Sequence, residues 1–204
     1  MKRLKIAISQ NVDQISSRAE MREGLDVRLS ALMWDLGFNP LPLSSSINDK
    51  LGYLNELNPD GFILSGGNDL GSVSERDQLE VAILEFSKSF KRPVLGICRG
   101  MQMINHFQDG TCEKVKGHAS VDHFITGSIT GHSNRVVNSF HNHGIKSKNL
   151  GRNLKILAKS KDGVVESLCH TTYPWLGIMW HPEREKNFSV CDKKIICEHL
   201  KEIK

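Results

Sequence analysis

Cys98 has the sequence surroundings of a catalytic nucleophile. It lies in the run VLGICRGMQMIN, in which Val94–Ile97 are apolar or small and predict a buried strand, while the residues from Arg99 onward have helical periodicity. Cys98 is therefore expected on the bend between strand and helix, with Gly96 and Gly100 leaving space beside it. The unpaired N–H groups at the start of the helix would favour thiolate over thiol. The pattern predicts a nucleophile elbow.

His181 and Glu183 are the expected partners of this nucleophile. A thiolate needs a base that takes up and returns a proton, and the base needs an acceptor that orients its other nitrogen. The two-residue spacing places both side chains on one face of an extended segment, which Pro182 stiffens. Together with Cys98 they predict a Cys-His-Glu triad.

Acyl chemistry also needs N–H donors for the oxyanion of the tetrahedral intermediate. Arg99, the residue after the nucleophile, supplies one backbone N–H by the geometry of an elbow. Gly67, in the turn SGGND, is the expected second donor because glycine lets the backbone approach a substrate closely. Gln102 lies one helical turn after Cys98, so its amide is expected to reach a substrate held over the sulfur.

Histidines offer a competing interpretation as a metal site. His141 and His143 alternate on a predicted strand, and with His181 they would supply three imidazoles, the ligands of many zinc sites. Zinc would leave the elbow, the double glycine and Glu183 without a role, so the sequence predicts neither a metal nor a cofactor. The remaining histidines show no spacing that singles them out: His106, His118, His123, His132, His170 and His199.

The elements that must position these residues alternate between strand and helix in the first half, which is typical of an α/β fold with a parallel sheet. Buried strands are expected at residues 4–9, 39–43, 61–65 and 94–97. One helix is expected from the apolar spacing of Met21 to Leu36, closed by Gly37, and another over residues 76–90.

The second half is expected to contain loops and hairpins at residues 109–131 and antiparallel strands. Those strands are expected at 136–140, 154–159 and 164–169, followed by a short strand at 177–180 that runs directly into His181. Ligands of open α/β sheets bind outside the carboxyl ends of the strands, where Gly67, Cys98 and His181 are expected. Residues 1–204 are expected to form a single domain.

Composition places further limits on function. A chain of 204 residues with 25% charged and 39% hydrophobic residues is ordinary for a soluble globular protein. It has no apolar run near the roughly 20 residues that span a bilayer and no signal-peptide core, so we expect a cytoplasmic protein without membrane contact. The net charge of +4 is spread along the chain and gives no basis for nucleic-acid binding. Five irregularly spaced cysteines argue against a disulfide framework, and no pattern indicates an oligomeric state.

These motifs resemble those of the class I glutamine amidotransferase superfamily, specifically its γ-glutamyl hydrolase branch typified by γ-glutamyl-γ-aminobutyrate hydrolases. The resemblance extends from about Leu4 to Glu183 and is carried by ILSGGND with RDQLE, LGICRGMQMIN, VNSFHNHGI and GIMWHPE. It implies a flavodoxin-like open sheet, mostly parallel, with helices on both faces and a smaller antiparallel region in the second half. It also implies that Cys98 is the nucleophile, His181 the base and Glu183 its orienting group.

The resemblance implies a reaction as well. Gln102 and the backbone around Ser139 and Phe140 would hold the γ-glutamyl part of a small-molecule substrate. Attack on its amide would form a γ-glutamyl thioester on Cys98, release the amine product, and end in hydrolysis to glutamate.

The chain departs from the branch where the leaving group is expected. It has His141, Asn142 and His143 in place of His-His-Gln, Asp109-Gly110 in place of a glycine pair, and a short segment between Gly67 and Arg76. The compact chain is also similar to the γ-glutamyl-CDP-amidate hydrolases of bacterial capsule biosynthesis. The expected substrate is therefore the nucleotide-linked γ-glutamyl-CDP, split into glutamate and cytidine diphosphoramidate. The expected contacts of the anionic leaving group are Arg76, Arg99 and His143, and His141 is a further expected substrate-binding residue.

Three other functions stay open. A γ-glutamyl-γ-aminobutyrate hydrolase of polyamine catabolism fits the branch but not Asn142 and His143. A glutaminase subunit of an amidotransferase would need a synthase partner to receive its ammonia. A non-catalytic binding protein of the same fold is disfavoured because no member of the triad is missing.

Overall fold

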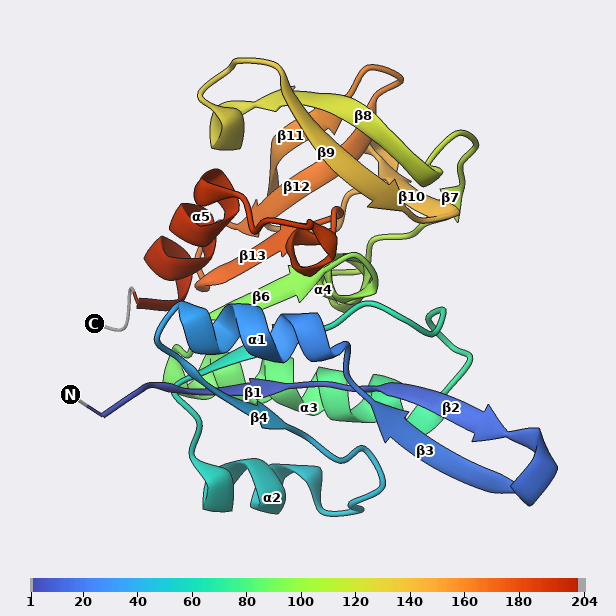
Figure 1. Ribbon diagram of the computed structural model, residues 1–204, viewed down its shortest axis with the longest axis vertical. Coiled ribbons are helices and arrows are strands. Elements are labelled where there is room, and N and C mark those ends of the chain that lie inside the picture. The colour runs from blue at the N-terminus through green and yellow to red at the C-terminus, as the bar shows by residue number, and fades with distance from the viewer. Residues whose placement is uncertain (1, 202–204) are drawn as a thin grey trace.

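Parallel strands form the half of the sheet that carries the candidate residues. The computed structural model describes residues 2–201, and Figure 1 shows these strands in its middle and lower part. Their order across the sheet is β4 (Asn39–Pro42), β1 (Lys5–Ile8), β5 (Gly61–Leu64), β6 (Val94–Ile97) and β13 (Trp175–Ile178). All neighbours in this series pair in parallel. Every residue of β5, β6 and β13 is buried, so both faces of the sheet centre are covered, as parallel sheets require.

The other half of the sheet is antiparallel. It continues from β13 through β12 (Val164–His170), β11 (Leu154–Ser160), β8 (Ala119–Gly127) and β9 (Arg135–Phe140). Two short strands attach to it: β10 (His143–Lys146) pairs with β12 and with β7 (Glu113–Lys114). The predicted α/β fold, with a mostly parallel sheet and an antiparallel region in the second half, is confirmed.

Five α-helices occur within residues 2–201: α1 (Val27–Asp35), α2 (Lys50–Leu57), α3 (Ser74–Phe90), α4 (Arg99–Phe107) and α5 (Val190–Lys201). Figure 1 shows α1 on the near side of the parallel strands and α3 on the far side. The α4 helix packs against β5, β6 and β13, so it lies directly behind the strand ends that carry the site. None of the helices in this part of the chain has both the length and the apolar composition needed to cross a bilayer.

The predicted helix that starts at Met21 is wrong in its first turns. Met21 lies in β3 (Glu20–Gly24), which pairs with β2 (Asn11–Ile15) as a two-stranded hairpin. Met21 is 59% exposed, so its spacing from the later leucines does not reflect a common buried face. The helix begins at Val27, because the Asp26 carboxylate accepts a hydrogen bond from the Arg28 N–H at 2.9 Å and caps it. The hairpin, α2 and α5 were not predicted.

Candidate active site

Cys98 lies on the bend between β6 and α4, as predicted. Its backbone has φ of +52° and ψ of −104°, a combination that residues with a side chain rarely adopt. Close backbone packing holds this bend. A Cβ at Gly96 would lie 2.5 Å from the Gly100 carbonyl carbon, and a Cβ at Gly100 would overlap the carbonyl oxygen of Leu64 in β5. The two glycines are therefore required by the elbow itself.

His181 and Glu183 lie beside this cysteine. The His181 Nδ1 is 2.6 Å from the Glu183 Oε1, a geometry in which Nδ1–H donates and Nε2 is left to face the sulfur of Cys98. All three side chains are buried, with residue exposures of 8%, 3% and 4% for Cys98, His181 and Glu183. The preceding strand β13 ends at Ile178, two residues earlier than predicted. The arrangement is that of a nucleophile, a base and an orienting acceptor.

Electrostatics favour the charged form of this pair. Burial lowers the pKa of His181, but its hydrogen bonds with Cys98 and Glu183 outweigh that effect and raise the pKa to about 9. The ring is therefore an imidazolium at neutral pH. The buried ring therefore holds a proton that it can transfer as a general acid.

Asn138 of β9 fixes the backbone of His181. Its side-chain oxygen accepts the His181 N–H at 2.9 Å, and its amide nitrogen donates to the His181 carbonyl at 2.8 Å and to Glu185 at 2.7 Å. Phe140, two residues further along β9, packs edge-on against the His181 ring with centroids 5.9 Å apart. The sequence alone did not single out Asn138, because the contact joins positions 43 residues apart.

The Gly66–Gly67 turn after β5 closes the other side of the site. A Cβ at Gly66 would lie 2.7 Å from the His181 Cε1, so the turn packs directly on the base. Arg76 donates to the carbonyl oxygens of Ser65 and Gly66, both at 2.8 Å. A trans peptide points its N–H opposite to its C=O, so the Gly67 N–H points away from Arg76. Gly67, at φ of +119°, adopts a backbone conformation that favours glycine, and it lines the same cavity as Cys98.

A buried ion network joins this turn to the elbow. Glu80 of α3 pairs with Arg76 at 3.2 Å and also with Arg99, which pairs in addition with Asp77. Burial lowers the pKa of Arg76 to about 10, which still leaves it a cation at neutral pH. Both guanidinium groups are buried and bind groups of the protein itself, which argues against the predicted contact of Arg76 and Arg99 with the leaving group.

A cavity of about 530 Å³ opens in front of Cys98. Gln102 lines it and donates its amide to the His143 carbonyl at 3.0 Å. The His143 ring is one-third exposed and lies 3.6 Å from the Asp69 carboxylate. Ser139 does not line this cavity, since it is fully buried with its hydroxyl donating to the His118 carbonyl. The complete lining is Gly67, Asp69, Cys98, Arg99, Gln102, Lys114, Val115, Lys116, Phe140, His141, Asn142 and His143.

The predicted alternation of His141 and His143 on one strand is wrong. A bend at Asn142 separates β9 from β10, and it leaves His141 buried while His143 faces the cavity. The ring of His141 is turned toward Glu166 in β12 instead, 3.7 Å away. Lys114 and Lys116 also line the cavity, and the sequence alone gave no sign of either, because the β7–β10 pairing brings them there.

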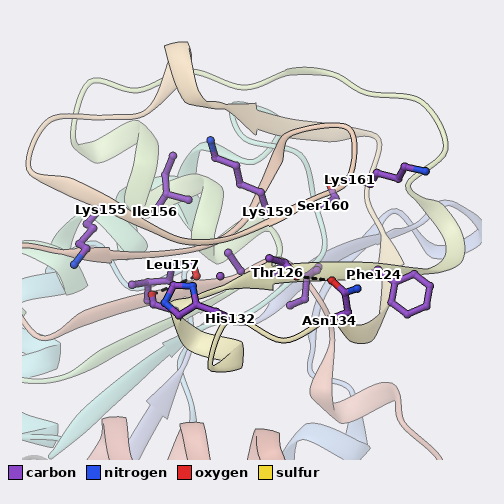
Figure 2. Close-up of a pocket in the computed structure, with 14 residues that line it drawn as sticks. Phe124, Thr126, His132, Asn134, Lys155, Ile156, Leu157, Lys159, Ser160 and Lys161 are labelled. Carbon is purple, nitrogen blue, oxygen red and sulfur yellow. Dashed lines mark hydrogen bonds between the residues drawn. The ribbon is translucent and has the colours of Figure 1, made fainter.

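A larger cavity of about 830 Å³ lies between β8 and β11, away from the triad (Figure 2). Figure 2 shows that its lysines, Lys155, Lys159 and Lys161, point in different directions instead of converging on one point. Its lining contains no cysteine, aspartate or glutamate. The chemistry therefore belongs to the smaller cavity, which contains Cys98.

Comparisons with known proteins agree with this geometry. Residues 27–196 match the family model described as glutamine amidotransferase class-I. The chain is 35% identical to the γ-glutamyl-CDP-amidate hydrolase of Campylobacter jejuni, over 90% of this chain and 92% of that one. It is 30% identical to a glutamine amidotransferase-like protein of Lactococcus lactis, over 76% and 78%. A solved structure of a GMP synthase protein from Thermoplasma acidophilum has the same fold, with a TM-score of 0.73 at 23% identity, over 98% of this chain and 94% of that one.

The charge state of His181 is measurable without any substrate. We expect its ring to titrate near pH 9 instead of near the ordinary 6.5, and Glu183→Gln to lower that midpoint because the imidazolium loses an anionic partner. By linkage, the stabilisation from the protonated ring is complete below about pH 6.5 and is lost as the pH rises through about 9. NMR titration of the histidine rings measures this, with exposed His106 as the reference. An unchanged midpoint in Glu183→Gln would contradict the pairing.

Glu80 is expected to support the fold as well as the site. Glu80→Gln keeps the shape but leaves two buried guanidinium groups without their shared anion, so we expect a loss of about 3–5 kcal/mol in unfolding free energy. Urea denaturation measures it. The matched control is Glu85→Gln on the same helix, whose half-exposed pair with Lys88 should contribute less than about 1 kcal/mol. Equal, small losses in both variants would show that the network does not stabilise the fold to this extent.

Proposed function

The chain belongs to the class-I glutamine amidotransferase family, and we propose that it hydrolyses a γ-glutamyl amide bond through a thioester on Cys98. The resemblance seen in the motifs is thereby confirmed at the level of the family. The observation that carries the proposal is the buried Cys98, His181 and Glu183 arrangement at the edge of a cavity. The strained backbone of Cys98 supports a catalytic role, since such strain persists at functional sites.

In the proposed reaction, the Cys98 thiolate attacks the γ-carbonyl carbon. The carbonyl oxygen becomes an oxyanion that accepts hydrogen bonds from the backbone N–H groups of Gly67 and Arg99. As the tetrahedral intermediate collapses, the C–N bond breaks and the His181 imidazolium protonates the departing amine. Neutral His181 then takes a proton from water, whose oxygen attacks the thioester. Glutamate leaves, and the thiolate and imidazolium are restored.

The γ-glutamyl part is proposed to lie against Gln102 and the backbone near Ser139 and Phe140. Gln102 is 6% exposed and its amide nitrogen is held by the His143 carbonyl. Its orientation is therefore fixed, and its side-chain oxygen is left to accept a hydrogen bond from the α-ammonium group of the substrate.

The proposed leaving group is a cytidine diphosphate linked through nitrogen, so that the substrate is γ-glutamyl-CDP. The relative from Campylobacter jejuni is named for this class of compound. Lys114 and Lys116 are exposed at the cavity, and within the described part of the chain no carboxylate lies within ion-pair distance of either. The two lysines offer positive charge to a diphosphate, and the His143 ring beside them can donate a further N–H. The proposal includes a cytoplasmic role in capsular polysaccharide biosynthesis, without a nucleic-acid partner.

The substrate is tested with the purified protein alone. Glutamate release is measured with γ-glutamyl-CDP, γ-glutamyl-γ-aminobutyrate and glutamine, and we expect the highest kcat/KM for γ-glutamyl-CDP. Equal inactivity on all three would end the hydrolase proposal. A preference for the aminobutyrate compound would reassign the protein to polyamine catabolism, and activity on glutamine only would favour a glutaminase subunit.

The same assay tests the lysines. Replacing Lys114 and Lys116 together by glutamine should lower kcat/KM for γ-glutamyl-CDP by at least about tenfold, and for glutamine by much less, because only the first carries a diphosphate. The matched control replaces Lys155 and Lys161 of the other cavity. A loss of the same size on both substrates would rule out a role in leaving-group recognition.

The triad variants test the mechanism. Cys98→Ser and His181→Asn should each lose at least about a thousandfold in kcat, since residues that act as a unit fail together. Glu183→Gln should lose less, because its amide oxygen still orients the ring. Cys191→Ser, which removes an exposed thiol on α5, is the control. Near-normal activity of Cys98→Ser would exclude the thioester, and a larger loss in Glu183→Gln than in His181→Asn would contradict the orienting role.

A further inference from the structure

A second cluster of titratable side chains is buried outside the triad. It consists of His118, just before β8, His123 in β8, His141, just after β9, and Glu166 in β12. Glu166 is fully buried, His118 and His141 are 3% exposed, and the His123 side chain is 16% exposed. A carboxylate and three imidazoles are thus gathered inside the protein, away from the triad.

The groups in this cluster are too far apart for good hydrogen bonds. Glu166 Oε1 lies 3.5 Å from His118 Nδ1 and 3.7 Å from His141 Nε2, and its Oε2 lies 3.4 Å from His123 Nε2. Good N–H···O bonds measure about 2.7–3.2 Å. Within residues 2–201 none of these five buried atoms has a hydrogen-bond partner. Leaving so many polar atoms unsatisfied at one place costs free energy, and native proteins avoid it.

The same distances suit a metal ion. Four ligand atoms at about 2.0–2.2 Å from a tetrahedral zinc ion lie about 3.3 Å from one another. The three separations around Glu166 are close to that value, and the ligand atoms of His118, His141 and Glu166 all lie within 4.8 Å of one another. A bound cation would give the unsatisfied ring nitrogens of His118 and His141 and the Glu166 carboxylate a partner.

In two of these rings, the nitrogen that points away from Glu166 already has a hydrogen-bond acceptor. His118 Nε2 lies 3.1 Å from the Asp162 carboxylate, and His141 Nδ1 lies 3.0 Å from the His143 carbonyl. Metal-bound histidines commonly donate their other N–H to a carboxylate or a carbonyl in this way. These acceptors fix the tautomers, so that lone pairs on His118 Nδ1 and His141 Nε2 face the centre of the cluster.

We propose that this cluster binds one divalent transition-metal ion, zinc by its ligand set, through the Glu166 carboxylate, His118 Nδ1 and His141 Nε2. Imidazoles and a carboxylate are ligands that zinc prefers, and His123 lies beside them with its Nε2 3.4 Å from the Glu166 Oε2. Because His118 and Glu166 do not line the substrate cavity, the ion is structural.

The ion would stabilise one wall of the active site. The His143 carbonyl accepts hydrogen bonds from both His141 and Gln102, which links the cluster to the cavity in front of Cys98. The Glu166 carbonyl accepts the Met179 N–H at 2.8 Å, two residues before His181. The metal site therefore holds segments on both sides of the substrate cavity without taking part in the chemistry.

The test measures metal binding and not activity, so that it stands apart from the proposed hydrolase function. Cys98→Ser serves as the background, because it removes the thiolate that would itself bind zinc. The full-length protein is purified, its metal content is measured by mass spectrometry, and the chelator-stripped form is titrated with Zn²⁺ or Co²⁺. We expect about one metal ion per chain, a cobalt form with the strong visible absorption of tetrahedral Co²⁺, and a thermal midpoint that rises by several degrees on metal addition.

Variants assign the site. Glu166→Gln and His118→Gln should each lower the affinity for Co²⁺ at least tenfold, whereas the controls His106→Gln and His132→Gln, at exposed positions, should leave it unchanged. If the site variants fail to fold, the cobalt spectrum and the thermal shift of the Cys98→Ser protein decide alone. A stripped protein that binds no cobalt and shows no thermal shift would overturn the proposal, as would unchanged cobalt affinity in folded Glu166→Gln.

Discussion

The buried carboxylate of Glu80 is the group on which the geometry of the active site depends. It pairs with Arg76 and Arg99 at once in the buried interior, and Asp77 supplies a second negative charge to Arg99. Arg76 binds the carbonyl oxygens of the turn after β5, and Arg99 is the first residue of α4, which follows β6. Through these two arginines, Glu80 fixes the position of the turn relative to the start of the helix. The two backbone N–H groups proposed to bind the oxyanion belong to these same segments. Preorganisation of this kind costs nothing at the moment of reaction, because the free energy of placing the donors is already part of folding.

The strain at Cys98 is maintained in the same way. A positive φ at a residue with a side chain costs about 1–3 kcal/mol, and it persists only where the surroundings leave no alternative. Here the backbone of Gly96 lies against that of Gly100, and Gly100 lies against β5, so the chain has no room to relax into an ordinary turn. The bend thus holds the sulfur between the start of α4 and the His181 ring. Neither of these neighbours depends on the leaving group, which explains why the chemistry can be proposed in more detail than the substrate.

Apolar runs and short residue spacings in the sequence predicted the features that depend only on neighbouring residues. Strands β1, β5 and β6, the elbow at Cys98, and the neighbouring His181 and Glu183 follow from apolar runs and short spacings, and they were found close to the expected residues. The roles of Arg76 and Arg99 were missed, because only the packing of α3 against α4 shows that their partners are Asp77 and Glu80. Lys114 and Lys116 reach the cavity through a two-residue strand whose pairing no periodicity indicates.

The histidine cluster shows most clearly why a spacing argument fails. His118 and His123 are five positions apart, an odd number that would place them on opposite faces of a regular strand. A β-bulge interrupts β8 between Ala119 and Val121, and Ser120 adopts φ of +56° there. The extra residue shifts the alternation by one, so both rings return to the side where His141 and Glu166 lie. From the sequence, the candidate metal ligands were His141, His143 and His181, and a metal was not expected because such a site would leave Glu183 and the elbow at Cys98 without a role. That argument does not apply to the proposed site at Glu166, which uses no member of the triad.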